Sequence, residues 1–201
     1  MIRNKVRLPL RNLFAAATAI TLLTAWQPLG EPVTLKAESR LWFDGESTVR
    51  DWSCTAKEME AAIDGEANAA AEVLNGRKAV RTVNLTIRTA RLDCDNRTMN
   101  NHMMKALNAE QHTTITFALV SYDVARAVTV TGTLQGTLTI NGQTRPVVLP
   151  VVFARADGAL RVTGTYPLDM TEWGIEPPKL MLGTMKVKPV VTVQFDLLLQ
   201  S

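Results

Sequence analysis

Catalytic signatures are missing from this sequence of 201 residues. It has no G-x-S-x-G nucleophile motif, no glycine-rich phosphate loop and no Cys-x-x-Cys pair. Histidine is scarce, and the two copies, His102 and His112, match no metal-ligand spacing. These absences favour a binding protein over an enzyme, and they predict neither a metal ion nor a catalytic cofactor.

Acidic residues are absent before Glu31, whereas four basic residues lie between Arg3 and Arg11. An uncharged apolar run, LFAAATAITLLTA, follows over residues 13–25 and is too short to cross a bilayer comfortably. This order is typical of a secretory signal peptide. We therefore predict that residues 1–30 are a leader, cleaved near residues 25–30, and that residues 31–201 form one exported, periplasmic domain. An uncleaved membrane anchor is the alternative.

Basic residues do not dominate outside the leader. The whole chain has a formal net charge of +3, from 22 Lys and Arg against 19 Asp and Glu. Without the four basic residues of the leader, the count is 18 against 19. A nucleic-acid-binding domain needs a concentrated basic surface, so no nucleic-acid partner is expected.

Cysteine is limited to Cys54 and Cys94. An even number of cysteines in an exported chain favours a disulfide between them. Closing a loop of this length stabilises a fold by about 4 kcal/mol in the chain-entropy model. The alternative is two separately buried thiols.

The clearest pattern is a period of two from Val128 to Ile140, where even positions are apolar or glycine and odd positions are Thr or Gln. This period is typical of a strand with one apolar and one polar face. Asn141-Gly142 follows, and this dipeptide favours a two-residue hairpin turn, which pairs Ile140 with Gln143. The other predicted pairs on the apolar face are Leu138 with Arg145, Gly136 with Val147, Leu134 with Leu149, Gly132 with Val151 and Val130 with Phe153.

Much of the remaining chain has the same period. Strands are predicted at residues 37–44, 47–56, 80–89, 113–122, 159–170 and 190–200. One helix is predicted from Met99 to Ala109, with Thr98 as its cap. Residues 31–36 are interpreted as a lead-in, and residues 57–78 as one or two short helices or a flexible arm. About eight strands must bury their apolar faces against one another, by closing into an antiparallel barrel or by stacking as a sandwich.

Five stretches resemble the YceI-like proteins, a family of exported lipid-binding barrels of bacteria. They are STVRDW (47–52), MNNHMMKALNA (99–109), GTLTINGQTRPVVLP (136–150), MTEWGIEPP (170–178) and VVTVQFDL (190–197). The resemblance implies an all-β fold, an elongated antiparallel eight-stranded lipocalin-like barrel with one short helix at an opening. It also implies an apolar channel for a long-chain lipid such as a polyisoprenoid or a quinone. Two departures are Trp173, where the family pattern suggests Phe, and the length of residues 57–78.

Glycines on the apolar faces, Gly132, Gly136 and Gly164, stand where a filled core usually has a larger residue. They are predicted to leave room for a ligand, with a backbone role in strand coiling as the alternative. The hairpin register turns Arg145 toward the apolar face near one end, where it meets a polar head group or forms a structural ion pair. Trp42, Trp52 and Ile175 are further lining candidates. The predicted ligand-binding residues are Gly132, Leu134, Gly136, Val147, Leu149, Phe117, Met103, Leu107, Trp173 and Arg145.

The expected function is a non-enzymatic periplasmic carrier or store for a long-chain apolar lipid of the polyisoprenoid, quinone or fatty amide or acid type. One alternative is a protein-interaction module whose barrel is filled by its own side chains. Another is an enzyme that acts on a lipid head group through Arg145, Asp169 and Glu172. The association of two chains into a homodimer is left open.

Overall fold

The computed structural model describes residues 31–66, 68–180 and 184–200, so the predicted leader lies outside the described residues. Eight strands form a barrel: β1 (Glu31–Leu35), β4 (Glu60–Gly65), β5 (Val80–Arg88), β7 (Thr114–Arg126), β8 (Val130–Ile140), β9 (Gln143–Ala156), β10 (Ala159–Asp169) and β12 (Met185–Gln200). The other strands are β2 (Arg40–Ser47), β3 (Asp51–Ala56), β6 (Leu92–Asp93) and β11 (Lys179–Leu180). The helices are α1 (Ala69–Leu74) and α2 (Arg97–Ala106), with 3-10 turns η1 (Thr89–Arg91) and η2 (Met170–Trp173).

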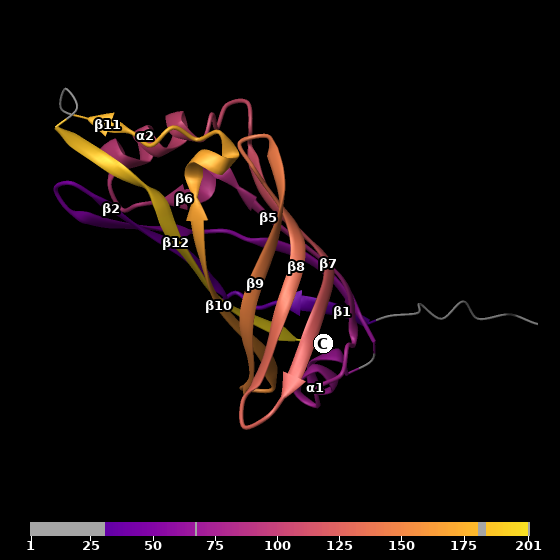
Figure 1. Cartoon of the computed structure of the whole chain (residues 1–201). Coiled ribbons are helices and arrows are strands. Elements are labelled where there is room, and N and C mark those ends of the chain that lie inside the picture. The colour runs from indigo at the N-terminus through magenta and orange to yellow at the C-terminus, as the bar shows by residue number, and fades with distance from the viewer. Residues whose placement is uncertain (1–30, 67, 181–183, 201) are drawn as a thin grey trace, which may run out of the picture.

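The barrel closes through its first strand. The eight strands follow one another in the order in which they occur in the chain, and all pairs are antiparallel. β1 then pairs with β12 through Thr34 with Gln200 and Leu35 with Leu199. The predicted elongated antiparallel barrel is confirmed, and Figure 1 shows α1 at one end and α2 at the other. We call these the α1 end and the α2 end.

β12 carries two neighbours along one edge. Its last residues pair with β1, while Val187 to Asp196 pair with β2. β3 and β6 continue the sheet beyond β2. β5 leads through η1 directly into β6, which pairs with β3.

The identity of the barrel strands differs from the sequence prediction. The predicted strands at residues 37–44 and 47–56 exist as β2 and β3, but they extend the sheet instead of closing it. The closing strands β1 and β4 come from the predicted lead-in and from the alanine-rich segment. Alanine and acidic residues have low strand propensity, so the EAAIDG sequence of β4 gave little signal. Its backbone is held between β1 and β5 on both sides.

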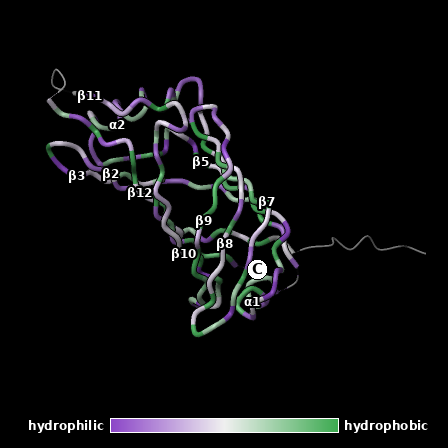
Figure 2. Tube along the Cα trace, in the orientation of Figure 1, coloured by the Kyte–Doolittle hydropathy of each residue, from purple (hydrophilic) through white to green (hydrophobic). Residues whose placement is uncertain are grey.

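α1 plugs one end of the barrel. A helix of six residues is not stable alone and depends on its packing. Ala69 and Val73 are each 1% exposed and pack against Val33, Ile63 and Phe153 in a continuous buried cluster. Figure 2 shows α1 in hydrophobic colours at this end.

The hairpin register is confirmed in full. Asn141 (φ 50°) and Gly142 (φ 71°) both adopt the positive φ that a type I′ turn requires. Ile140 pairs with Gln143, and the five further predicted pairs, down to Val130 with Phe153, are all present.

The predicted helix is present with shifted ends. α2 begins at Arg97, and the side chain of Asn96, not that of Thr98, accepts the capping hydrogen bond from the Met99 amide at 3.0 Å. Thr98 is the second residue of the helix, so the prediction that it caps was wrong. Asn and Thr are both common caps, and the extended backbone of Asn96 decides between them.

Aromatic rings cover the glycines of the apolar faces. A Cβ atom placed on each glycine would collide with a ring from a neighbouring strand, so glycine is the residue that lets the ring lie flat on the sheet. The pairs are Gly132 with Phe153, Gly136 with Phe117, Gly164 with Phe195 and Gly45 with Trp52. The prediction that Gly132, Gly136 and Gly164 leave room for a ligand was wrong, because a phenylalanine ring occupies the space above each of them, and at Gly132 the backbone oxygen of Asp123 is closer still.

Gly164→Ala tests this packing, because all three close contacts of the added Cβ are atoms of the Phe195 ring. We expect the substitution to lower the free energy of unfolding by about 1 to 3 kcal/mol, as overpacking does. Adding Phe195→Leu removes the ring. The double variant should then lose less stability than the sum of the two single changes. Strict additivity in denaturant unfolding would contradict the packing described here.

Candidate ligand-binding cavity

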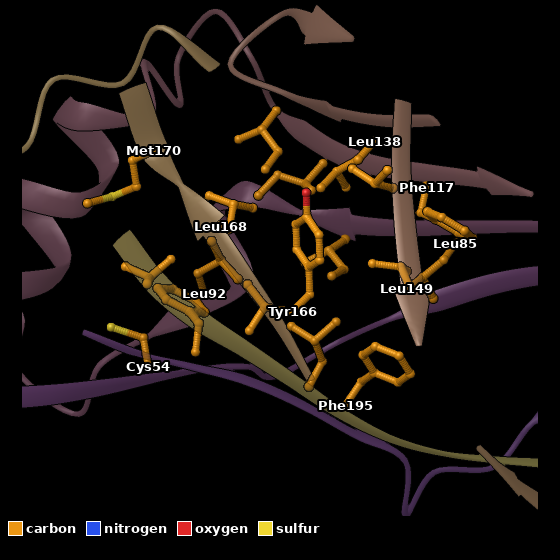
Figure 3. A pocket seen from close by; sticks show the side chains of 18 of the residues that line it. Cys54, Leu85, Leu92, Phe117, Leu138, Leu149, Tyr166, Leu168, Met170 and Phe195 are labelled. Atoms are coloured by element: carbon orange, nitrogen blue, oxygen red, sulfur yellow. The ribbon is translucent and has the colours of Figure 1, made fainter. Parts of the chain in front are cut away.

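An apolar cavity of about 770 Å³ occupies the barrel interior. Pockets for small organic ligands span roughly 300 to 1,000 Å³. The wall is built from alternate residues of the barrel strands and from β2, β3 and α2, because side chains of a strand point alternately in and out. Figure 3 shows Leu85, Phe117, Leu149 and Leu168 facing this space from different strands.

The cavity opens at the α2 end. Apart from the aromatic side chains, the exposed or half-exposed polar residues of its wall lie at the turn between β2 and β3 and at the start of α2. They are Ser47, Arg50, Asn96, Thr98 and His102. The α1 end is closed by the buried cluster around Val73 and Phe153. In the described part of the chain, the entrance for a ligand therefore lies between the β2–β3 turn and α2.

Charge is nearly absent from the wall. Among the described lining residues, Arg50 at the entrance is the one side chain that is always charged. Two tyrosines bring hydroxyl groups inward. The Tyr122 hydroxyl accepts a hydrogen bond from the Val80 amide at 3.0 Å. Burial, with a smaller effect of the Glu172 carboxylate, raises the pKa of Tyr166, so this phenol stays neutral across the physiological range.

Polar contacts hold α2 over the opening. No residue of α2 is fully buried, so packing alone does not fix it. Asn100 donates to the Asp93 carboxylate at 2.7 Å, and its side-chain oxygen accepts from the Cys94 amide at 2.8 Å. The Asp95 amide also donates to Asp93, at 3.0 Å, and Lys57 lies 3.5 Å from that carboxylate. The Asn100 hydrogen bond first, and then the Asp95 amide and Lys57, hold the pKa of Asp93 below its usual value.

A disulfide adds a covalent link at the same place. Cys54 of β3 and Cys94, three residues before α2, are bonded, which confirms the sequence prediction. Both cysteines line the cavity, and the Met103 sulfur lies 3.8 Å from Cys94 Sγ. The disulfide thus ties the start of α2 to the sheet that it covers.

The structure brings six of the ten predicted ligand-binding residues to the cavity wall. These are Phe117, Leu134, Val147, Leu149, Met103 and Leu107. Of the further candidates, Trp52 and Ile175 line the cavity and Trp42 does not. Binding by these residues remains a prediction.

The other four predicted residues support the wall from outside the cavity. Gly132 and Gly136 lie beneath phenylalanine rings. Trp173 is 1% exposed and donates through Nε1 to the Leu138 carbonyl at 3.2 Å. Arg145 is exposed and donates through Nε to the carbonyl oxygen of Glu172. The apolar-face position next to the turn therefore lets Arg145 reach η2 at the rim, where it holds the backbone next to Trp173 instead of facing a ligand.

Tyr166 is one of several lining residues that the sequence prediction did not select, and it brings a polar group. It lies on the apolar side of β10, in the predicted alternation, and a hydroxyl group on that side was the available signal. His102 also lines the entrance.

Other site types have no counterpart in residues 31–66, 68–180 and 184–200. No group of three or more His, Cys, Asp or Glu side chains is arranged to hold a metal ion there. None of the helices in this part of the chain has the length and apolar character needed to span a membrane.

Comparison with known proteins identifies the family. A model of the YceI-like domain matches residues 34–199. The chain belongs to the YceI-like family. No curated protein matches the sequence.

Three solved structures are similar to this fold. BcnA of Burkholderia cenocepacia has a TM-score of 0.65 at 18% identity, covering 84% of this chain and 100% of BcnA. A polyisoprenoid binding domain from Saccharophagus degradans has a TM-score of 0.62 at 13% identity, covering 84% of this chain and 98% of that domain. The Campylobacter jejuni YCEI protein has a TM-score of 0.57 at 16% identity, covering 74% of this chain and 84% of that one. At these identities the likeness establishes the fold.

Asp93→Asn tests how α2 is anchored. A lowered pKa means that the carboxylate stabilises the folded state above about pH 4, and that this contribution is lost as the pH falls through the folded pKa. Because asparagine is uncharged, the Asp93→Asn variant at pH 7 should behave as the wild-type protein does at a pH below the pKa of Asp93. We expect several-fold faster amide hydrogen exchange in α2 at pH 7, with exchange in β7 to β10 unchanged.

Asp95→Asn is the matched control. The Asp95 side chain is 86% exposed and meets Lys57 at 3.4 Å. Its loss should leave α2 protected, because exposed ion pairs contribute little. Equal protection of α2 in the Asp93→Asn variant and the wild type would refute the anchoring role of Asp93.

Proposed function

We propose that this YceI-like barrel is a non-enzymatic periplasmic carrier or store for a long-chain apolar lipid of the isoprenoid type. The observation that carries the proposal is the apolar cavity of about 770 Å³ that opens under α2. The polyisoprenoid binding domain from Saccharophagus degradans has the same fold, which supports the choice of ligand.

Apolar burial alone supplies the binding energy. Burying one five-carbon isoprene unit is worth roughly 3 to 4 kcal/mol, at about 0.8 kcal/mol per carbon, before the costs of association. A few units therefore suffice for tight binding. The methionines at the entrance, Met99 and Met103, are flexible enough to adapt to a moving chain.

A storage or carrier role suits the wall better than catalysis. The described lining residues include no Asp, Glu or Lys, and His102 at the rim is the one histidine among them. The open interior also favours a ligand-filled barrel over a protein-interaction module with a filled core.

Leu85→Trp tests whether the cavity holds the lipid. Leu85 lines the cavity and is partly buried, so a larger side chain there takes the space of the ligand. Lipid recovered by organic extraction and quantified by mass spectrometry should fall several-fold relative to the wild type. Asn84→Trp places the same bulk on the outer face of β5 and should keep the full lipid content.

Two results would count against a lipid carrier. One is wild-type protein, purified without detergent, that yields no stoichiometric lipid. The other is a folded Leu85→Trp variant that retains its full lipid content.

Export is the second part of the proposal, supported by the leader pattern in residues 1–30 and by the disulfide. The intact mass of protein from the periplasmic fraction should correspond to a chain that starts between residues 26 and 31. Free-thiol titration of the denatured, unreduced protein should find no thiol. A periplasmic mass that retains residues 1–25 would show that the leader is not cleaved.

A further inference from the structure

The backbone ladder of the barrel is interrupted between β9 and β10. The two strands pair from their shared turn only as far as Val151 with Gly164. Toward the α2 end, β10 continues to Asp169 in register with β12, and the first half of β9, from Gln143, is in register with β8. Figure 1 shows β9 and β10 separating in this direction. We call this break in the ladder the seam.

The parity of the two strands shows which backbone groups face the seam. In an antiparallel ladder, alternate residues of a strand bond to the neighbour on one side, and the residues between them bond to the other side. The turn at Asp157-Gly158, with φ of 47° and 78°, closes on Ala156 and Ala159. Even-numbered residues of β9 and odd-numbered residues of β10 therefore direct their backbone groups toward each other.

Three prolines explain why the ladder stops where it does. Continuing the β9–β10 register would pair residue 150 with 165, residue 148 with 167 and residue 146 with 169. Each of these three pairs contains one proline, which has no N–H to donate, and these are Pro150, Pro167 and Pro146. The sequence thus removes a donor from every pair that would close the seam.

The apolar cavity lies directly behind the seam. Val147 and Leu149 of β9 and Tyr166 and Leu168 of β10 all line it. Figure 3 shows Leu149 on one side of this space and Tyr166 and Leu168 on the other. Because prolines interrupt the ladder here, this part of the wall can separate at little cost in backbone hydrogen bonds.

η2 spans the seam. It follows β10 directly and is bonded across the gap to the β8–β9 hairpin. The side-chain amide of Asn141 donates to the carbonyl oxygens of Trp173 at 3.2 Å and of Gly174 at 3.3 Å. Arg145 of β9 donates to the carbonyl oxygen of Glu172. Side chains of the hairpin thus hold the backbone of η2.

The two covers of the α2 end are attached in different ways. Trp173 of η2 packs in one buried cluster with Val147 of β9 and Leu168 of β10, so its ring fills the space between the strands. The start of α2 is fixed to the sheet by the Cys54–Cys94 disulfide. η2 is held to the hairpin by hydrogen bonds and packing, which can be broken and remade. The cover that can release is therefore η2.

We propose that η2 is a clasp across the seam, and that its release from the β8–β9 hairpin opens the barrel wall sideways for an apolar ligand. This inference rests on the proposed lipid-binding function and adds the route of entry. Because the seam lies at the α2 end, its opening widens the entrance under α2 into a lateral slot. A long chain then enters along its length instead of end first.

Stopped-flow binding of diphenylhexatriene, a rod-shaped fluorescent hydrocarbon, to delipidated protein tests the clasp. Asn141→Gly keeps a residue that tolerates the positive φ of the turn and removes both amide hydrogen bonds to η2. We expect the association and dissociation rates to rise together by about tenfold, while Kd changes less than about twofold, because a released clasp speeds passage in both directions.

Two variants are matched controls. Asp157→Gly makes the same kind of change at the first position of the β9–β10 turn, at the α1 end, and should change neither rate. Asn108→Gly removes the hydrogen bond of 2.8 Å that joins the end of α2 to Asn141. It should also leave both rates unchanged. If Asn108→Gly alone reproduces the faster rates, α2 is the moving part and the inference is overturned.

The reverse change should close the seam. Pro150→Thr combined with Pro167→Thr supplies the missing N–H groups at positions 150 and 167. These two amides should be protected from hydrogen exchange, and the hydrocarbon should associate and dissociate about tenfold more slowly. Protected amides with unchanged hydrocarbon rates would overturn the lateral route. If the amides are not protected, the Asn141→Gly rates decide.

The outcomes separate the clasp from the proposed function. Unchanged rates in Asn141→Gly, with the hydrocarbon bound at wild-type affinity, overturn the clasp and leave the lipid-binding function standing. Failure of the wild-type protein to bind the hydrocarbon overturns both.

Discussion

The two-residue pairing between β1 and the end of β12 is the contact on which the rest of this structure depends. It converts a sheet with two free edges into a barrel, and free edges invite pairing with other chains. Closure also creates the apolar interior. The apolar faces of the strands meet across the barrel, so they are shielded from water without a second sheet. The same edge of β12 then carries β2, so the chain reuses its longest strand to build the wider α2 end.

The positions of the aromatic rings divide the barrel interior into a filled part and an open part. Near the α1 end, Phe153 and Phe195 lie over glycines and join the cluster that contains α1. Toward the α2 end the wall carries Leu, Ile, Val and Met side chains that do not meet in the centre, and the cavity remains. Glycine thus contributes here by admitting a ring close to the backbone.

The two ends of the barrel are held by different forces. The α1 end is stabilised by apolar packing, with Ala69 and Val73 almost fully buried. The α2 end is held by the Asp93–Asn100 hydrogen bonds, the Asn96 cap and the Cys54–Cys94 disulfide, while α2 itself has no fully buried residue. Segments with few buried apolar contacts open at lower free energy than the core. The entrance is therefore built where the fold has least packing to lose.

The sequence by itself determined the strands with a strong period of two, the β8–β9 register, the one long helix and the disulfide, because these depend on neighbouring residues or on cysteine count. It also placed six of ten predicted residues on the cavity wall. Tertiary structure decided that β1 and β4 close the barrel, since their weak sequence signal is overcome by hydrogen bonds to distant strands. It also decided that rings fill the space above Gly132 and Gly136, and that Arg145 reaches a backbone carbonyl. Alternation along a strand shows which face a residue occupies, but only the packing of all strands together shows what it meets there.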